Sequence, residues 1–199
     1  MTFRNPLLFV FLLVLRPLSA DSPEIGDVAP DWNLLPGTDG KQHSLKDLKD
    51  AEAIVVCFTS NTCPYSIDYE DRLMALQKKY TDDGANVPVV AINANGIPAD
   101  DLEQMIERAT SKNFNFLYLK DASQEVARAY GAIYTPEFYV LNRQKQIVYR
   151  GAMDDATKEA DVKIRYVERA VTAAREGGVP DVQKTGARGC AIRFKRQRR

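Results

Sequence analysis

The chain has 199 residues, of which 45% are hydrophobic and 27% are charged, a make-up that excludes collagen, coiled coil and chain-wide disorder. The 27 basic and 27 acidic side chains cancel, but residues 184–199 contain seven bases and no acid. The remaining body is therefore acidic and offers no basic face to a nucleic acid, and we expect the tail to be a solvated end resting on this body.

Residues 1–20 have the layout of a secretory signal peptide. Arg4 precedes nine uninterrupted apolar residues at 7–15, and the small Ala20 stands before Asp21. A membrane-spanning helix needs about 20 apolar residues, so the run favours a cleaved signal over the alternative of an uncleaved anchor. We therefore expect an exported protein with no membrane attachment after signal removal, in a compartment where disulfides persist.

The rest of the chain predicts an α/β domain with a small extension at its start. Residues 25–48 predict a β-hairpin around the turn Asp39-Gly40, with Trp32 packed in the core. From residue 53 onward, short β-type segments alternate with amphipathic helical segments. The predicted strands cover 53–59, 87–93, 116–119, 138–141 and 146–150, and the predicted helices cover 65–80, 102–109, 123–130 and 164–174. The pattern predicts one domain at 21–178 and a basic tail at 179–199.

The three cysteines call for separate interpretations. Cys57, Cys63 and Cys190 lack the paired spacing of a structural zinc site and are too few for a disulfide-built fold, so we expect neither metal nor cofactor. Cys57 lies inside the predicted strand 53–59 and is interpreted as a small core residue. Any thiol chemistry must then depend on Cys63 and Cys190 individually.

Cys63 lies at the junction between the predicted strand 53–59 and the helix that follows. Pro64 suits the first position of a helix, where a missing N–H costs nothing. A thiolate at this position faces unpaired backbone donors and the positive end of the helix dipole, which lowers its pKa. A fall from about 8.5 to about 7 would raise the thiolate fraction at neutral pH from roughly 3% to roughly half. The alternative is a structural cysteine; the polar approach at 60–62 favours a reactive one.

Two motifs far apart in the chain resemble a known family. Cys63-Pro64-Tyr65-Ser66 follows an apolar strand and opens a helix, and Tyr134-Thr135-Pro136-Glu137-Phe138 opens a later strand. This order resembles the thioredoxin superfamily, and within it the redoxin (AhpC/TSA-like) branch. The similarity runs from Gly26 to the last helix, and Gly189-Cys190-Ala191-Ile192 is similar to the Gly-Cys-Ser-Ile-type tail of secreted bacterial relatives.

The resemblance implies a fold, a location and two further site residues. It implies that residues 21–178 form a thioredoxin-like (redoxin) domain, with a central mixed β-sheet and helices on both faces. It implies that Pro136 is a cis-proline facing the active thiol, and that the Thr135 backbone is available to pair with an extended substrate. It also implies a periplasmic or extracellular protein of the bacterial cell envelope.

The sequence departs from the family pattern beside the nucleophile. Ser60 stands where the secreted relatives carry an extra cysteine, and Thr62 replaces their histidine. Ser66 stands where a dithiol thioredoxin carries its resolving cysteine, and Cys57 stands where thioredoxin carries a buried aspartate. Cys63 therefore has no cysteine partner within its own loop, and a dithiol cycle confined to that loop is excluded.

Cys190 is the remaining candidate for a resolving thiol. The chain between Gly177 and Cys190 could span about 43 Å when extended, whereas the folded body should have a radius of gyration of about 15 Å. The tail could thus reach Cys63 from almost any starting point. Geometry permits this pair without demanding it, and an unpaired or intermolecular Cys190 stays open as the alternative.

Three functions compete. The first is a thiol–disulfide oxidoreductase with antioxidant activity. In it, the Cys63 thiolate attacks a protein or small-molecule disulfide, and Cys190 or an external thiol resolves the mixed disulfide. An external reductant then restores the thiols. The second is a peroxiredoxin-like thiol peroxidase, for which Ser60 fits but Val56 and Pro136 stand where a proline and an arginine are expected. The third is a redox-inactive thioredoxin-fold binding or copper-handling module. Its metal option is weak because His43, the one histidine, is interpreted as a surface turn residue.

Overall fold

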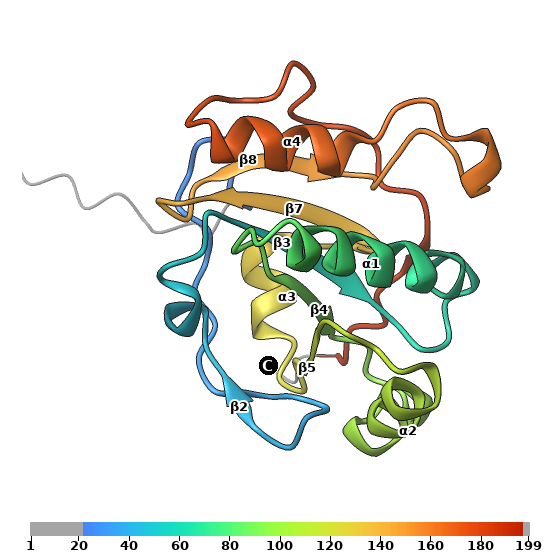
Figure 1. Cartoon of the computed structure of the whole chain (residues 1–199). Helices are drawn as coiled ribbons and strands as arrows, with labels where there is room; N and C mark the ends of the chain where they lie inside the picture. Colours follow the sequence, from blue (N-terminus) through green and yellow to red (C-terminus); the bar gives the residue numbers. More distant parts are fainter. Residues whose placement is uncertain (1–21, 197–199) are drawn as a thin grey trace, which may run out of the picture.

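The computed structural model describes residues 22–196, and its centre is a five-stranded mixed sheet (Figure 1). The predicted signal peptide lies outside the described residues. The strand order is β5-β4-β3-β7-β8; β3, β4 and β5 run parallel to one another, whereas β7 is antiparallel to β3 and to β8. The strands are β3 (Ala53–Thr59), β4 (Val89–Asn93), β5 (Leu117–Lys120), β7 (Glu137–Asn142) and β8 (Ile147–Gly151). The predicted mixed sheet is confirmed.

Every predicted strand and helix except the strand at 53–59 shifts at an end by one to three residues, and two of these shifts have a clear local reason. β4 begins at Val89 and not at residue 87, because Pro88 has no N–H to donate to a neighbouring strand. The helix predicted from 123 begins at Glu125, because Gln124 has a φ of 65° and so a left-handed conformation that cannot continue a right-handed helix. Both shifts leave the order of the elements unchanged.

Helices cover both faces of the sheet, as predicted. α1 (Pro64–Asp82) and α4 (Tyr166–Arg175) cover one face, and α2 (Leu102–Lys112) packs on β4 and β5 through Met105. α3 (Glu125–Tyr130) covers the other face together with the N-terminal segment. β3 is buried along its whole length because it lies between these two layers. This burial explains its nearly continuous apolar sequence.

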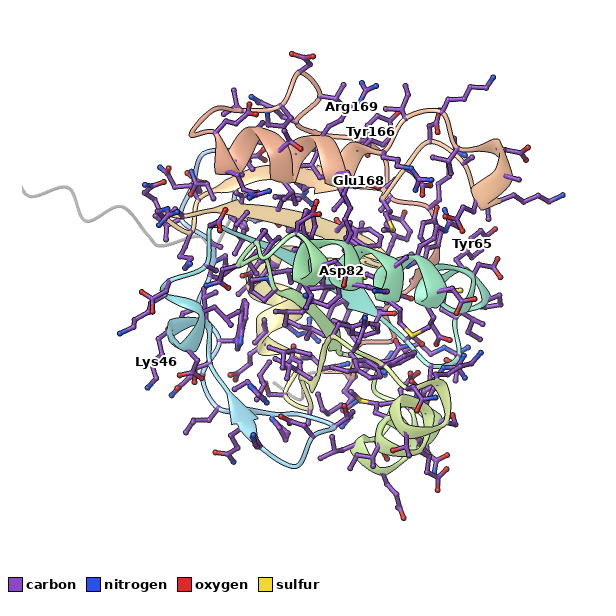
Figure 2. The ribbon with its side chains drawn as sticks, viewed as in Figure 1. Lys46, Tyr65, Asp82, Tyr166, Glu168 and Arg169 are labelled. Atoms are coloured by element: carbon purple, nitrogen blue, oxygen red, sulfur yellow. The ribbon has the colours of Figure 1, made fainter. Side chains whose placement is uncertain are left out.

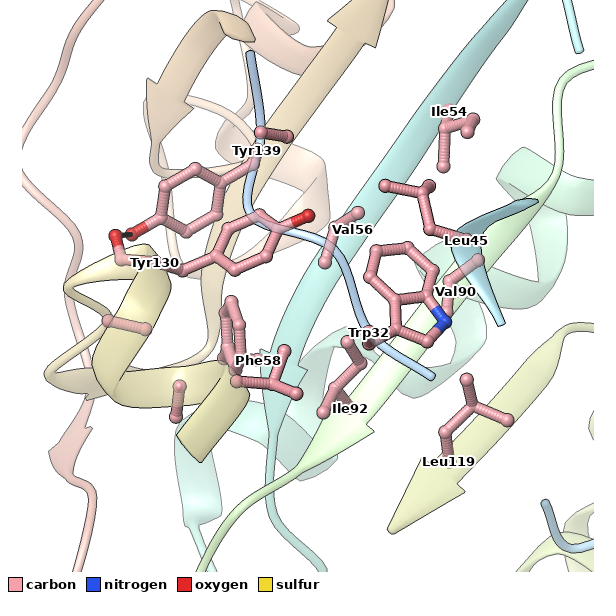
Figure 3. Close-up of a cluster of buried hydrophobic side chains, with 14 of the residues drawn as sticks. Trp32, Leu45, Ile54, Val56, Phe58, Val90, Ile92, Leu119, Tyr130 and Tyr139 are labelled. Atoms are coloured by element: carbon pink, nitrogen blue, oxygen red, sulfur yellow. Dashed lines mark hydrogen bonds between the residues drawn. The ribbon is translucent and has the colours of Figure 1, made fainter. Parts of the chain in front are cut away.

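An aromatic cluster fills the core beneath α3 (Figure 3). Phe58 from β3 and Tyr139 from β7 each make an edge-to-face contact with Tyr130, at ring-centroid distances of 5.4 and 5.2 Å. Trp32 is buried on the same face, which confirms its interpretation as a core residue. Its approach to Tyr130 joins the N-terminal segment to the sheet. The core thus ties together four segments that are distant in sequence.

The N-terminal hairpin is present but short. β1 (Leu35–Pro36) pairs antiparallel with β2 (Gln42–His43), and the turn between them includes Gly40 at a φ of 77°. A bridge from Gly37 to Leu119 attaches the hairpin to β5. The described residues also contain three single-turn 3-10 helices: η1 (Leu45–Leu48), η2 (Pro98–Asp100) and η3 (Glu159–Asp161). Within residues 22–196, the helices are all too short or too polar to cross a bilayer.

The C-terminal segment is part of the fold. It descends from α4 past β8 to the neighbourhood of α3 (Figure 1). The backbone of Lys184 forms an isolated parallel β-bridge with Arg150 of β8. Farther along, β9 (Cys190–Ala191) pairs antiparallel with β6 (Tyr134–Thr135). Its basic side chains up to Arg196 are exposed, as expected, but the backbone of the described segment is not a free solvated end, and Ile192 is only 6% exposed. The apolar residues that interrupt the basic run explain the difference, because their burial favours docking.

Candidate functional site

Cys63 is the N-cap residue of α1, directly after the loop that leaves β3. Pro64 is the first helical residue, so the predicted junction of strand, cysteine and helix is confirmed. The Cys63 residue is 3% exposed, and its thiol donates a hydrogen bond to the carbonyl oxygen of Thr135 at a sulfur–oxygen distance of 2.9 Å. The carbonyl belongs to the residue before Pro136, and the Thr135–Pro136 peptide bond is cis. The two motifs singled out in the sequence therefore meet at this sulfur.

The pKa of the Cys63 thiol is lowered by the groups around it. Burial alone would raise this pKa, but hydrogen bonds from the Cys190 side chain, the Thr135 side chain and the backbone N–H of Ser66 outweigh burial. Ser66 is the third residue of α1, and its N–H has no partner within the helix. The direction of the shift is the one expected for a thiol at a helix N-terminus.

Cys190 reaches Cys63 through the pairing of β9 with β6. Thr135 and Cys190 are register partners, so the strand pair carries the second thiol to the first. The hydrogen bond with Cys63, together with burial, raises the pKa of Cys190 to about 11. Both are free thiols in this structure. Because one pKa is lowered and the other raised, Cys63 is the thiol that ionises first.

The Thr135 backbone is already occupied in this structure. The resemblance implied that it would be available to an extended substrate, but Cys190 pairs with it, and the Thr135 hydroxyl lies 3.4 Å from the Cys190 carbonyl oxygen. The chain's own C-terminal segment thus fills the position expected for a substrate strand. Sequence reasoning missed this pairing, because nothing in the tail other than Cys190 pointed to it.

Ser66 and Ser60, both singled out in the sequence, have different surroundings. Ser66 offers its backbone N–H to Cys63, while its buried hydroxyl has no hydrogen-bond partner. The Ser60 hydroxyl lies 3.1 Å from a carboxylate oxygen of Asp100 and 2.9 Å from the amide nitrogen of Asn95. The structure therefore brings Ser66 to the nucleophile and engages Ser60 in a separate buried cluster.

This cluster is centred on Asp100, a fully buried residue that sequence reasoning missed. Its carboxylate accepts hydrogen bonds from the Asn61 backbone N–H (2.6 Å), the Thr62 hydroxyl (3.0 Å) and the Asn93 side-chain amide (2.7 Å). Lys120 donates to the Asp100 carbonyl oxygen at 2.7 Å, and burial lowers the pKa of this lysine. The cluster fixes the loop that leads into Cys63. The sequence feature that could have pointed to this cluster is the polar run Asn93-Ala94-Asn95 at the end of an apolar strand.

Glu137 is a second missed residue. It follows Pro136, and one carboxylate oxygen accepts hydrogen bonds from the backbone N–H groups of Ile133 (3.0 Å) and Tyr134 (3.2 Å). These bonds hold the backbone that leads into β6. The buried carboxylate thus orients the strand that Cys190 pairs with.

Cys57 and His43 lie in structural positions. Cys57 is fully buried in β3, and burial, with a smaller contribution from the charge of Glu137, raises its pKa well above the usual value. Its interpretation as a core residue is confirmed. His43 lies on β2 with Nε2 3.0 Å from a carboxylate oxygen of Asp39. In the described part of the chain, no three His, Cys, Asp or Glu side chains group together as a metal site would require.

Exposed apolar side chains lie close in sequence to Cys63 and to the strand that pairs with Cys190. Tyr65 lies at the N-terminal end of α1, two residues from Cys63, and is exposed (Figure 2). Ile133 and Tyr134, just before and within β6, are exposed as well. A rim of this composition suits contact with a polypeptide more than with a charged small molecule.

A model of the AhpC/TSA family matches residues 25–150. A hypothetical protein from Sinorhizobium meliloti is 33% identical with a TM-score of 0.79, over 88% of this chain and 97% of that one. An uncharacterized conserved protein from Geobacillus kaustophilus is 35% identical with a TM-score of 0.79, over 88% of this chain and 94% of that one.

A third solved structure is more distant. It is a putative thiol:disulfide interchange protein DsbE from Chlorobium tepidum, which is 22% identical with a TM-score of 0.55, over 65% of this chain and 85% of that one. A likeness at this identity shows the fold alone, and it confirms the predicted thioredoxin-like architecture. No curated protein matches the chain.

Proposed function

Because the chain belongs to the AhpC/TSA family of thioredoxin-like redoxins, we propose that it is a thiol–disulfide oxidoreductase with Cys63 as nucleophile and Cys190 as resolving thiol. One observation carries the proposal. The pairing of β9 with β6 sets the two thiols in hydrogen-bond contact, with the pKa of Cys63 lowered and that of Cys190 raised. This asymmetry supports different roles for two chemically identical side chains.

In the first step, the Cys63 thiolate attacks one sulfur of a substrate disulfide. A bond forms between Cys63 and that sulfur, and the other substrate sulfur leaves as a thiolate that takes up a proton. The Ser66 N–H, at the start of α1, stabilises the attacking thiolate. The Thr135 carbonyl accepts a hydrogen bond only while Cys63 is protonated, so this contact is released on ionisation.

In the second step, Cys190 attacks the Cys63 sulfur of the mixed disulfide. The second substrate sulfur leaves as a thiolate, so the substrate gains two electrons and the protein holds a Cys63–Cys190 disulfide. The pKa of Cys190 is raised by its hydrogen bond to Cys63 and by the charge on Cys63. Both effects end when Cys63 enters the mixed disulfide, so Cys190 ionises more readily at the moment it is needed. An external dithiol then reduces the pair.

The site supports disulfide exchange better than peroxide reduction. A peroxidase of this family would need the hydroxyl three residues before the nucleophile to be free to hydrogen-bond to the peroxide. Here the Ser60 hydroxyl is taken up by Asp100 and Asn95. We therefore keep thiol peroxidase activity as the alternative reaction, with peroxides as its substrates.

The cellular setting follows from the sequence. The signal-like residues 1–20 support export to the bacterial cell envelope, where protein and small-molecule disulfides persist and can serve as substrates. An antioxidant role there would consist of returning oxidised thiols to the reduced state. The necessary electrons would come from an external thiol reductant.

Reduction of a small disulfide, hydroxyethyl disulfide, with a dithiol reductant tests the proposal. We expect Cys63→Ser to abolish the activity and Cys190→Ser to accumulate a mixed disulfide visible by mass spectrometry. Cys57→Ala is the matched control, because this buried thiol takes no part in the cycle and its loss should leave turnover intact. Fast peroxide consumption without reduction of the small disulfide would replace exchange by the alternative reaction, and inertness of the wild type in both assays would refute both.

A further inference from the structure

Residues 189–195, here called the strap, lie along β6 like a bound strand. Cys190 pairs with Thr135 and Ala191 pairs with Tyr134, and the Ile192 N–H donates to the Ile133 carbonyl oxygen at 2.9 Å. The strap therefore uses the backbone groups next to Pro136 that any extended polypeptide would need. It is an intramolecular occupant of that edge.

Gly189 shows how closely the strap is fitted to the site. A Cβ at this position would lie 2.0 Å from the Thr135 carbonyl oxygen and 3.0 Å from the Pro136 nitrogen. Both are backbone atoms, which cannot turn aside as a side chain could. Only glycine allows the strap to approach the Thr135–Pro136 peptide so closely. By contrast, a Cβ on Gly186 would meet nothing within 4 Å.

The strap is also anchored beyond Cys190. The Arg193 backbone N–H donates to the Asn95 side chain at 2.7 Å, and its carbonyl oxygen accepts from the Gly96 N–H at 3.1 Å. The Lys195 N–H donates to the Gln124 side chain at 2.7 Å. Ile192, buried between Cys190 and these contacts, adds an apolar anchor on the same side of the cysteine.

The docked strap closes the site. With the strap in place, Cys63 is 3% exposed. A polypeptide disulfide would need the β6 backbone and the space of the strap at once, whereas a small disulfide needs only the sulfur itself.

We propose that the strap is a built-in competitor that selects the substrate: docked, it excludes polypeptide disulfides, and a polypeptide is reduced only after displacing it strand for strand. Small disulfides need a lesser opening around Gly189 and Cys190 and are the preferred substrates of the docked state. The inference rests on the proposed function, because it describes what reaches the Cys63 nucleophile. The exposed rim of Tyr65 and Tyr134 would contact a polypeptide that has replaced the strap.

Alkylation of Cys63, followed by mass spectrometry of its peptide across a range of pH, measures access and activation separately. The limiting rate at high pH reports access, and the midpoint reports the pKa. We expect Gly189→Ala to raise the limiting rate about tenfold or more, because the open fraction of the site sets the apparent rate. Gly186→Ala should match the wild type. Equal limiting rates in the wild type and Gly189→Ala would overturn the proposal that the docked strap limits access to Cys63.

A second pair of variants removes the resolving thiol from the comparison. Cys190→Ser keeps the strap, whereas a chain ending at Arg188 lacks it, and neither has a thiol at 190. We expect the limiting alkylation rate of Cys63 to be higher in the truncated chain than in Cys190→Ser. This ratio should be at least as large as the ratio of the limiting rates of Gly189→Ala and the wild type. A midpoint at the ordinary cysteine pKa in every variant would refute the lowered pKa of Cys63 on which the proposed function rests. The ratio of limiting rates would still decide whether the strap limits access to Cys63.

Substrate selection is measured by single-turnover oxidation of the reduced protein. Insulin serves as the polypeptide disulfide and hydroxyethyl disulfide as the small one. We expect Gly189→Ala to raise the insulin rate relative to the hydroxyethyl disulfide rate by about tenfold, and Gly186→Ala to leave the ratio unchanged. An unchanged ratio in Gly189→Ala would overturn substrate selection by the strap.

Discussion

Thr135 and Cys190 are paired in antiparallel register, and through this pair the carbonyl group that accepts the Cys63 hydrogen bond is joined to the strand that carries the second thiol. The backbone, and not only the side chains, therefore sets the distance between the two sulfurs. Any change that loosens β9 must alter the ionisation of Cys63 and the access to it together.

The first prediction concerns the ionisation of Cys63. The Cys190 thiol donates to the Cys63 thiolate, so Cys190→Ala removes a group that stabilises the charged form, and the pKa of Cys63 should rise. Cys190→Ser keeps an O–H donor and should raise it less. The midpoint of the pH-dependent alkylation of Cys63 measures both. A midpoint that falls in Cys190→Ala would contradict the hydrogen bond.

The second prediction concerns the Asp100 cluster. Asp100→Asn replaces a buried carboxylate that accepts several hydrogen bonds by an amide that must turn a donor toward some of the same groups. We expect a loss of about 2–4 kcal/mol in the free energy of unfolding, measured with urea. The exposed Asp101→Asn is the control, because asparagine caps a helix as well as aspartate does. Equal stability of the two variants would refute the role of the cluster.

The third prediction separates two tyrosines of the aromatic cluster (Figure 3). The Tyr130 hydroxyl is buried without a partner, so Tyr130→Phe should leave the free energy of unfolding unchanged or slightly raise it. The Tyr139 hydroxyl donates to the Tyr130 carbonyl oxygen at 3.0 Å, so Tyr139→Phe should cost about 1 kcal/mol. Denaturant unfolding of the two variants checks the difference, and the reverse order would contradict it.

The fourth prediction concerns the redox state. A Cys63–Cys190 disulfide would close a long loop, and we expect it to stabilise the oxidised protein by about 3–5 kcal/mol relative to the reduced protein. Urea unfolding with and without a reductant measures the difference. Cys190→Ser should abolish it, whereas Cys57→Ala should retain it. A wild type equally stable in both states would count against the bond.

Much of the fold was predictable because its signals are local. The apolar run at 53–59 predicted β3, and the apolar spacing from Tyr65 to Tyr80 predicted α1. Errors in the predicted strands and helices were at their ends, where a single residue such as Pro88 or Gln124 can override the pattern. The docked tail was missed because β9 pairs with a strand distant in the chain. In the site, Cys63 was found because a cysteine, a proline and a helix start are neighbours in sequence.

The sequence by itself determined the order of strands and helices, the place of Cys63 at the start of α1 and the candidacy of Cys190, because each depends on residues a few positions apart. Only the tertiary structure decided that Cys190 lies on the Thr135 backbone and that Asp100 supports the loop before Cys63. These contacts join segments distant in the chain through backbone pairing and buried polar groups. No local pattern of residue types encodes such contacts, since their partners are chosen by how the packed elements meet.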